Sequence, residues 1–193
     1  MRTRSWTMDG VGDQARTMAG RFDQMSIALH WLTVALVIEQ VTTAWLLARG
    51  GAYVAALLTL HRSMGALTWI VVAARIGWRH YFAYLPPFPE SMPRLQRRIA
   101  KLNEYGLYAL LLLQPLSGLA MMLFRGRSFG LFFWQVPTLL GRDFGVSEFF
   151  RSLHAFGAWG LLALIGLHAA AALLHGIVLR DGVLQRMLPW KVC

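Results

Sequence analysis

The chain has 193 residues, a length that suits one compact domain. Hydrophobic residues make up 56% of it and charged residues 15%, whereas soluble domains average about 25% charged residues, so an ordinary water-soluble fold is excluded. The formal net charge of +10 does not indicate nucleic-acid binding, because Lys and Arg lie at the ends of apolar stretches and form no patch or tail.

Residues 1–21 are polar, contain both Arg and Asp, and lack an apolar run that could serve as a signal peptide. We expect them to form a cytoplasmic extension, with residues 22–193 forming one transmembrane domain. The only cysteine is Cys193, so no disulfide within the chain and no Cys-based metal site is expected.

Four stretches are long and apolar enough to cross a bilayer core of about 30 Å as helices. They are about Ser26–Leu47, Val54–Trp78, Asn103–Phe124 and Phe149–Leu179. The loop after the second stretch contains Leu85-Pro86-Pro87-Phe88-Pro89, which breaks a helix, and Pro115 predicts a kink inside the third. The sequence therefore predicts an all-α fold, a four-helix transmembrane bundle.

Lys and Arg are distributed unevenly between the two sides of this bundle. Thirteen lie in the N-terminal segment, the loop after the second stretch with its flanks, and the C-terminus, against six on the opposite side. Because cytoplasmic segments carry the excess of positive residues, both termini are predicted to be cytoplasmic. The six on the outer side, an unusually large number, are Arg49, Arg62, Arg125, Arg127, Arg142 and Arg151.

Histidines within these stretches are candidate metal ligands, because ionisable residues in a membrane helix are rare and face the bundle interior. His154 and His168 are 14 residues apart, so they project from one face of the fourth helix about 21 Å from each other. Each can ligate one haem if another helix supplies a second axial ligand at matching depth. Zinc is the competing use of histidine, but two well-separated pairs on three helices do not suit it.

Depth in the membrane predicts how the ligands pair. His61 and His154 both lie near the outer ends of their helices and form a natural outer pair. His30 lies near the cytoplasmic end of the first helix, where His168 and His175 compete as its partner. With His61 and His154 at one level, His168 matches the depth of His30, whereas His175 lies about 10 Å nearer the cytoplasm. Four imidazoles on two irons leave no open axial position, which suits electron transfer.

Two further residues near the inner pair are candidates for cofactor contacts. Arg75 is 14 residues from His61 and so lies at the depth of the inner haem. It could bind a haem propionate or extend along the helix end toward water, and the sequence leaves both readings open. His175 could hydrogen-bond a quinone carbonyl or donate a proton during quinone reduction.

The chain resembles the bacterial cytochrome b561 family, a branch of the group that includes the cytochrome b subunits of nickel-iron hydrogenases. The resemblance runs from about Phe22 to Lys191. The matching segments are Ser26-Ile27-Ala28-Leu29-His30-Trp31-Leu32, His61 with Gly65 and Arg75, Gly118-Leu119-Ala120-Met121-Met122, Arg125-Gly126, Leu153-His154, Gly166-Leu167-His168-Ala169-Ala170-Ala171-Ala172 and Arg186-Met187-Leu188-Pro189. Glu39 departs from the pattern, which is apolar there, and has no assigned role.

The resemblance implies a multi-pass protein of the bacterial inner membrane that binds two haem b groups through His30, His61, His154 and His168. A branch with very similar motifs oxidises periplasmic superoxide to dioxygen and reduces ubiquinone, so a superoxide:ubiquinone oxidoreductase is expected. Arg62 and Arg125 would then attract superoxide to the outer haem. Two alternatives are a haem-containing anchor and electron relay for a periplasmic dehydrogenase or hydrogenase, and a non-redox transporter or structural membrane protein.

Overall fold

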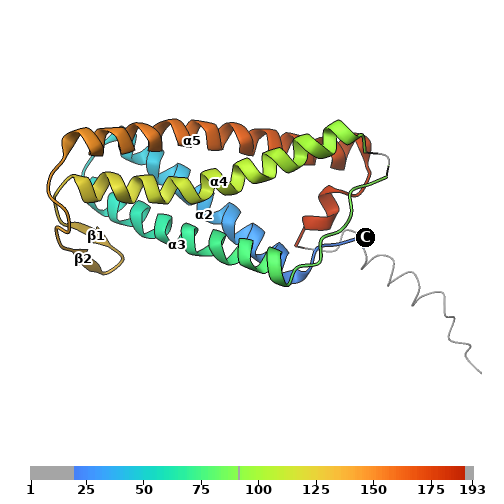
Figure 1. The fold of residues 1–193 in the computed structure, drawn as a ribbon, viewed down its shortest axis with the longest axis horizontal. Helices are drawn as coiled ribbons and strands as arrows, with labels where there is room; N and C mark the ends of the chain where they lie inside the picture. The colour runs from blue at the N-terminus through green and yellow to red at the C-terminus, as the bar shows by residue number, and fades with distance from the viewer. Residues whose placement is uncertain (1–19, 91, 190–193) are drawn as a thin grey trace, which may run out of the picture.

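The computed structural model describes residues 20–90 and 92–189. The predicted N-terminal extension, apart from its last two residues, and Cys193 lie outside this part of the chain. Four helices run along the molecule (Figure 1): α2 Gln24–Arg49, α3 Val54–Tyr81, α4 Arg94–Phe124 and α5 Phe144–Leu173. All four are long and apolar enough to cross a membrane when α5 is counted with its continuation to Leu179. The predicted four-helix transmembrane bundle is confirmed.

Two helices begin before their predicted apolar stretches. The α4 helix begins at Arg94 instead of near Asn103, and α5 begins at Phe144 instead of Phe149. Hydropathy marks the part of a helix that suits lipid, whereas backbone hydrogen bonding continues into the polar layer outside it. The added turns of α4 are therefore basic and exposed.

Aspartates cap two of the helices. The side chain of Asp143 accepts a hydrogen bond from Val146 N–H at the start of α5, and Asp23 accepts one from Ser26 N–H at the start of α2. Asp23 also accepts from the Ser26 hydroxyl and from Trp78 Nε1–H on α3. Burial alone would raise the pKa of Asp23, but these hydrogen bonds outweigh it and hold the pKa below its ordinary value.

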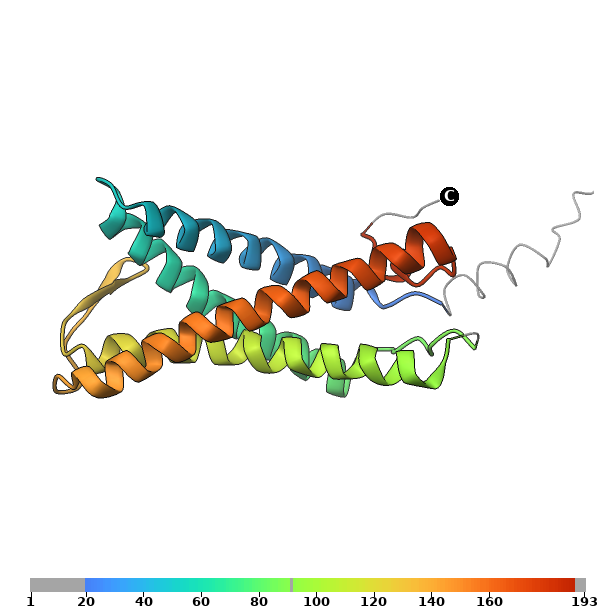
Figure 2. The same cartoon turned by 90° about the horizontal axis from the view of Figure 1, so that it is seen from above.

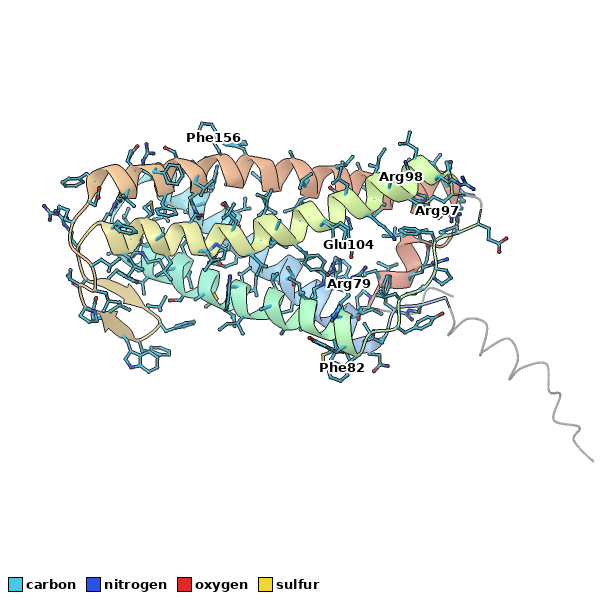
Figure 3. All side chains as sticks on the ribbon, viewed as in Figure 1. Arg79, Phe82, Arg97, Arg98, Glu104 and Phe156 are labelled. Carbon is cyan, nitrogen blue, oxygen red and sulfur yellow. The ribbon has the colours of Figure 1, made fainter. Side chains whose placement is uncertain are left out.

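The bundle consists of two antiparallel helix pairs (Figure 2). The α2 helix packs along α3, α4 packs along α5, and contacts between α3 and α4 join the two pairs. Within the described residues, α5 has no comparable packing against α2 or α3. Phe156 projects from the outside of α5, where lipid would cover it (Figure 3). Trp159 on the same helix is also mostly exposed.

One end of the bundle, here called the hairpin end, carries a two-stranded antiparallel sheet. Strands β1 Phe129–Leu131 and β2 Trp134–Val136 pair through Leu131 and Trp134 next to the turn. The turn residue Phe132 donates its backbone N–H to Ser63 Oγ on α3 at 2.6 Å, which fastens the hairpin to the bundle. The sequence pattern does not indicate these strands.

The opposite end, here called the terminal end, holds the first and last described residues. After α5 the chain continues as a π-helix, η1 Leu174–Leu179, and returns through a short 3-10 helix, η2 Leu184–Met187. Trp31 Nε1–H donates to the Met187 carbonyl at 2.8 Å, and Arg186 donates to the Pro87 carbonyl at 2.6 Å. The returning segment thus ties α2 to the proline-rich loop.

Candidate functional site

Two pairs of histidine rings face each other between the helices. His61 on α3 and His154 on α5 form the pair nearer the hairpin end, with ring centroids 6.4 Å apart. His30 on α2 and His168 on α5 form the pair nearer the terminal end, with centroids 6.2 Å apart. These are the same two pairs that the depths of the histidines predict from the sequence.

The α5 helix supplies one ring to each pair, and the 14 residues between them correspond to about 21 Å along its axis. Both pairs bridge helices that make few direct contacts, α3 with α5 and α2 with α5. His168 is exposed as a residue, although its ring faces His30.

Polar side chains on α2 hold His61 in position. Thr43 Oγ1 lies 2.8 Å from His61 Nδ1, and Gln40 Nε2–H donates to the His61 backbone carbonyl at 2.9 Å. The same amide group donates to Glu39 Oε2 at 2.8 Å, while Glu39 Oε1 is buried without a partner among the described residues. Glu39 therefore contacts the residue that supports His61.

His154 is held in the same way from α4. Its Nδ1 lies 2.9 Å from the Gln114 backbone carbonyl and 3.2 Å from Ser117 Oγ, and Gln114 Nε2–H donates to the His154 carbonyl at 3.1 Å. A Cβ atom added at Gly118 would lie 3.2 Å from His154 Cε1, so glycine lets the ring approach the α4 backbone. This support is not among the features predicted from the sequence, although polar residues three positions apart in apolar helices are a signal for it.

Arg75 lies near the terminal-end pair. Its charge is close enough to act on both His30 and His168, and its guanidinium stacks over Tyr108 at 5.4 Å from the ring centroid. The nearby carboxylate of Glu104 pairs with a different arginine, Arg79, at 2.8 Å (Figure 3). Within the described residues, Arg75 has no carboxylate partner at ion-pair distance.

His175 is not part of either ring pair. It is 5% exposed in the π-helix η1, its Nδ1 lies 2.5 Å from Asp181 Oδ2, and its Nε2 lies 2.9 Å from Gln96 Nε2 on α4. Burial alone would raise the pKa of Asp181, but hydrogen bonds from His175 and Val183 N–H outweigh it and lower the pKa. At neutral pH, His175 therefore faces an ionised carboxylate.

The outer arginines differ in their contacts. Three are engaged locally: Arg49 stacks on Trp45, Arg142 stacks on Phe144, and Arg151 pairs with Glu148. Arg62 and Arg125, in contrast, lie close enough to repel each other. Arg62 also lies over Phe129 of β1, 5.8 Å from the ring centroid, and directly follows His61. The two positive charges therefore lie near each other at the hairpin end, with the Glu148 carboxylate close enough to act on Arg125.

Comparison with known proteins assigns this arrangement to a family. A family profile described as prokaryotic cytochrome b561 matches residues 21–190. The chain belongs to the prokaryotic cytochrome b561 family.

Three relatives match over most of the chain. Cytochrome b561 homolog 1 of Escherichia coli (strain K12) is 27% identical over 172 residues, covering 88% of this chain and 97% of that protein. Probable superoxide oxidase CybB of Yersinia pestis is 30% identical over 177 residues, covering 90% and 99%. Cytochrome b561 homolog 2 of the same Escherichia coli strain is 30% identical over 173 residues, covering 87% and 91%. Like the family, this cytochrome b561 is a membrane electron-transfer protein.

Membership in the family implies haem b, and the ring pairs fit that cofactor. A metal–imidazole bond is about 2 Å long and the ring centre lies about 1.2 Å beyond the nitrogen, so two axial imidazoles have centroids roughly 6.4 Å apart. The observed separations of 6.4 and 6.2 Å match that geometry. At the hairpin end, the Nδ1 atoms of both rings contact protein groups, as metal-bound histidines usually do, which leaves Nε2 for the metal.

Proposed function

We propose that this cytochrome b561 binds two haem b groups, one between His61 and His154 and one between His30 and His168, and carries electrons across the inner membrane. The observation that carries the proposal is the pair of facing imidazoles at each of two levels on α5. Haem held by such a pair of imidazoles would supply one-electron transfer. The hairpin end is periplasmic and both termini are cytoplasmic, following the Lys and Arg distribution.

The electron donor at the hairpin end is superoxide, which loses one electron to become dioxygen. Arg62 and Arg125 attract this small anion, because fixed positive charge raises the encounter rate with an anion. The name of the Yersinia pestis relative, Probable superoxide oxidase CybB, agrees with this choice of donor. Arg62 directly follows His61 and lies over Phe129 of β1, and Arg125 begins the loop that carries β1.

The electron acceptor at the terminal end is ubiquinone, which takes two electrons and two protons to become ubiquinol. His175 hydrogen-bonds one quinone carbonyl through Nε2, the atom now in contact with the Gln96 amide. The Asp181 carboxylate accepts Nδ1–H and orients the ring, so that a proton carried on Nε2 can pass to the reduced quinone. Arg75 would bind a propionate of haem held by His30 and His168, since no carboxylate among the described residues pairs with it.

Pulse-generated superoxide, followed at the haem absorption band, tests the proposed donor. We expect fast reduction that slows as salt is raised, because the attraction acts over about 8 Å at physiological ionic strength. Arg62→Gln should slow the reaction without loss of haem. The matched control is Arg151→Gln, whose arginine is already paired with Glu148, and it should change the rate less.

A rate that is indifferent to salt and to Arg62→Gln would count against superoxide steering. It would favour the second candidate, an electron relay for a periplasmic dehydrogenase or hydrogenase. The exposed aromatic tip of the hairpin, with Phe133 98% and Trp134 74% exposed, could serve such a partner.

A further inference from the structure

The two hairpin-end histidines are supported by the same arrangement of side chains, once from α2 and once from α4. In each case a glutamine amide donates to the backbone carbonyl of the histidine. In each case a hydroxyl oxygen three residues after that glutamine approaches Nδ1 of the same histidine. The residues are Gln40 and Thr43 for His61, and Gln114 and Ser117 for His154.

These polar groups are buried inside membrane-spanning helices. Thr43 is 3% exposed and Ser117 is 1% exposed. Buried polar groups in a membrane need hydrogen-bond partners, and both hydroxyls have them in the histidines and in carbonyls of their own helices. Apolar residues would fit these positions without that requirement, so the hydroxyls are expected to serve the histidines.

The contacts favour the same protonated ring nitrogen in both histidines. The Gln114 backbone carbonyl can only accept a hydrogen bond, so His154 must donate to it from a protonated Nδ1. Thr43 can donate its single hydroxyl proton to the carbonyl of Glu39 or Gln40, at 3.0 and 3.1 Å. Its oxygen, 2.8 Å from His61 Nδ1, can then accept a hydrogen bond from Nδ1–H. In this arrangement both rings have an unprotonated Nε2, as a metal ligand requires.

The terminal-end pair lacks this support on at least one side. His30 Nδ1 is buried and has no hydrogen-bond partner among the described residues. A ring whose Nδ1–H is donated to an acceptor is the more basic ligand and favours the ferric state of the iron. The two haem sites thus differ in a property that changes reduction potential.

We propose that Thr43 and Ser117 are positioning residues that hold His61 and His154 as Nδ1–H donors and thereby lower the reduction potential of the hairpin-end haem alone. The contribution of Thr43 is the larger, because it is the only described group bonded to His61 Nδ1. His154 keeps the closer Gln114 carbonyl when the Ser117 hydroxyl is removed. This inference rests on the haem ligation proposed above.

Potentiometric titration of the haem-loaded protein tests the inference, with each haem assigned from His30→Ala and His61→Ala. Thr43→Val keeps the shape of the side chain and removes its hydrogen bond. We expect the reduced-to-oxidised ratio of the hairpin-end haem at a fixed potential to rise about tenfold. This is the lower end of the roughly 10- to 100-fold effect on metal affinity or activity that follows when a metal ligand loses its hydrogen-bond partner. For one electron, that ratio is a shift of about 59 mV. The terminal-end haem should not shift.

The matched control is Thr42→Val, the same change at the neighbouring residue. Among the described residues its hydroxyl bonds only the Ile38 carbonyl, so neither haem should shift. Ser117→Ala should raise the hairpin-end potential by less than Thr43→Val does. If Thr43→Val holds too little haem to titrate, Ser117→Ala alone decides. Unchanged potentials, or a shift of the other haem, would overturn the inference. Two haems retained in His61→Ala would instead overturn the proposed ligation.

Discussion

Replacing the four ring-pair histidines two at a time gives the sharpest test of the proposed ligation. The rings within each pair have centroids 6.2 or 6.4 Å apart, whereas the two pairs are separated by about 21 Å along α5. Sites more than about 10 Å apart without shared partners usually respond independently. Loss of one axial imidazole should therefore remove its own haem and leave the other in place.

The expected haem content follows from that separation. If the wild type holds the two proposed haems, each single His→Ala variant should retain one. The double variant His61→Ala/His154→Ala should still retain one, because both changes remove the same site. The double variant His61→Ala/His168→Ala should retain none. Exposed His80 lies outside both pairs, so His80→Ala is the control and should keep both haems.

Pyridine haemochrome spectra, normalised to protein concentration, measure the content, and redox titration identifies which haem remains. If the cross-pair double variant kept one haem, or the within-pair double variant kept none, the pairing would be wrong. Global misfolding is recognised separately, because it would lower the haem content of all double variants alike.

Two further predictions concern the terminal end. His175→Ala should keep both haems and slow ubiquinone reduction in stopped-flow assays, since it removes the proposed quinone contact. Loss of a haem would show that His175 is a haem ligand after all, and unchanged kinetics would contradict its role in quinone reduction. The pKa of Asp23 in the folded protein is lower than its ordinary value of 3.8, so the ionised side chain contributes its full stabilisation at pH values above 3.8. That stabilisation is lost as the pH falls through the pKa of the folded state. Thermal unfolding in detergent should therefore show a larger fall in Tm from pH 7 to pH 3 for the wild type than for Asp23→Asn, and equal falls would refute this.

The parts of the structure that the sequence predicts well are those set by periodicity and depth. The four spans follow from hydropathy, because lipid demands long apolar helices. The spacing of His154 and His168 places two rings on one face of α5 by helix geometry alone. When the neighbouring helices are aligned by depth in the membrane, His61 matches His154 and His30 matches His168.

Contacts between helices were less predictable. Gln40 and Thr43 are three residues apart on α2, which indicates a polar face. The sequence around them does not indicate that this face contacts His61. That contact depends on the register between α2 and α3. The bond between His175 and Asp181 depends on the π-helical turn that widens the end of α5, and hydropathy cannot distinguish such a turn from an α-helix.

The α4 helix shows how a helix without a ligand still defines the site. A Cβ atom added at Gly157 would lie 2.6 Å from Gln114 Oε1, and one added at Gly106 would lie 2.7 Å from the side chain of Leu164. Small residues therefore allow α4 and α5 to approach closely, as is common between membrane helices. This packing restricts sliding of α5, and sliding would move both of its histidines together. The α4 helix, which supplies no histidine to either pair, thus determines the depth of both ring pairs along the bundle. Its residues Gln114 and Ser117 also fix the orientation of the His154 ring.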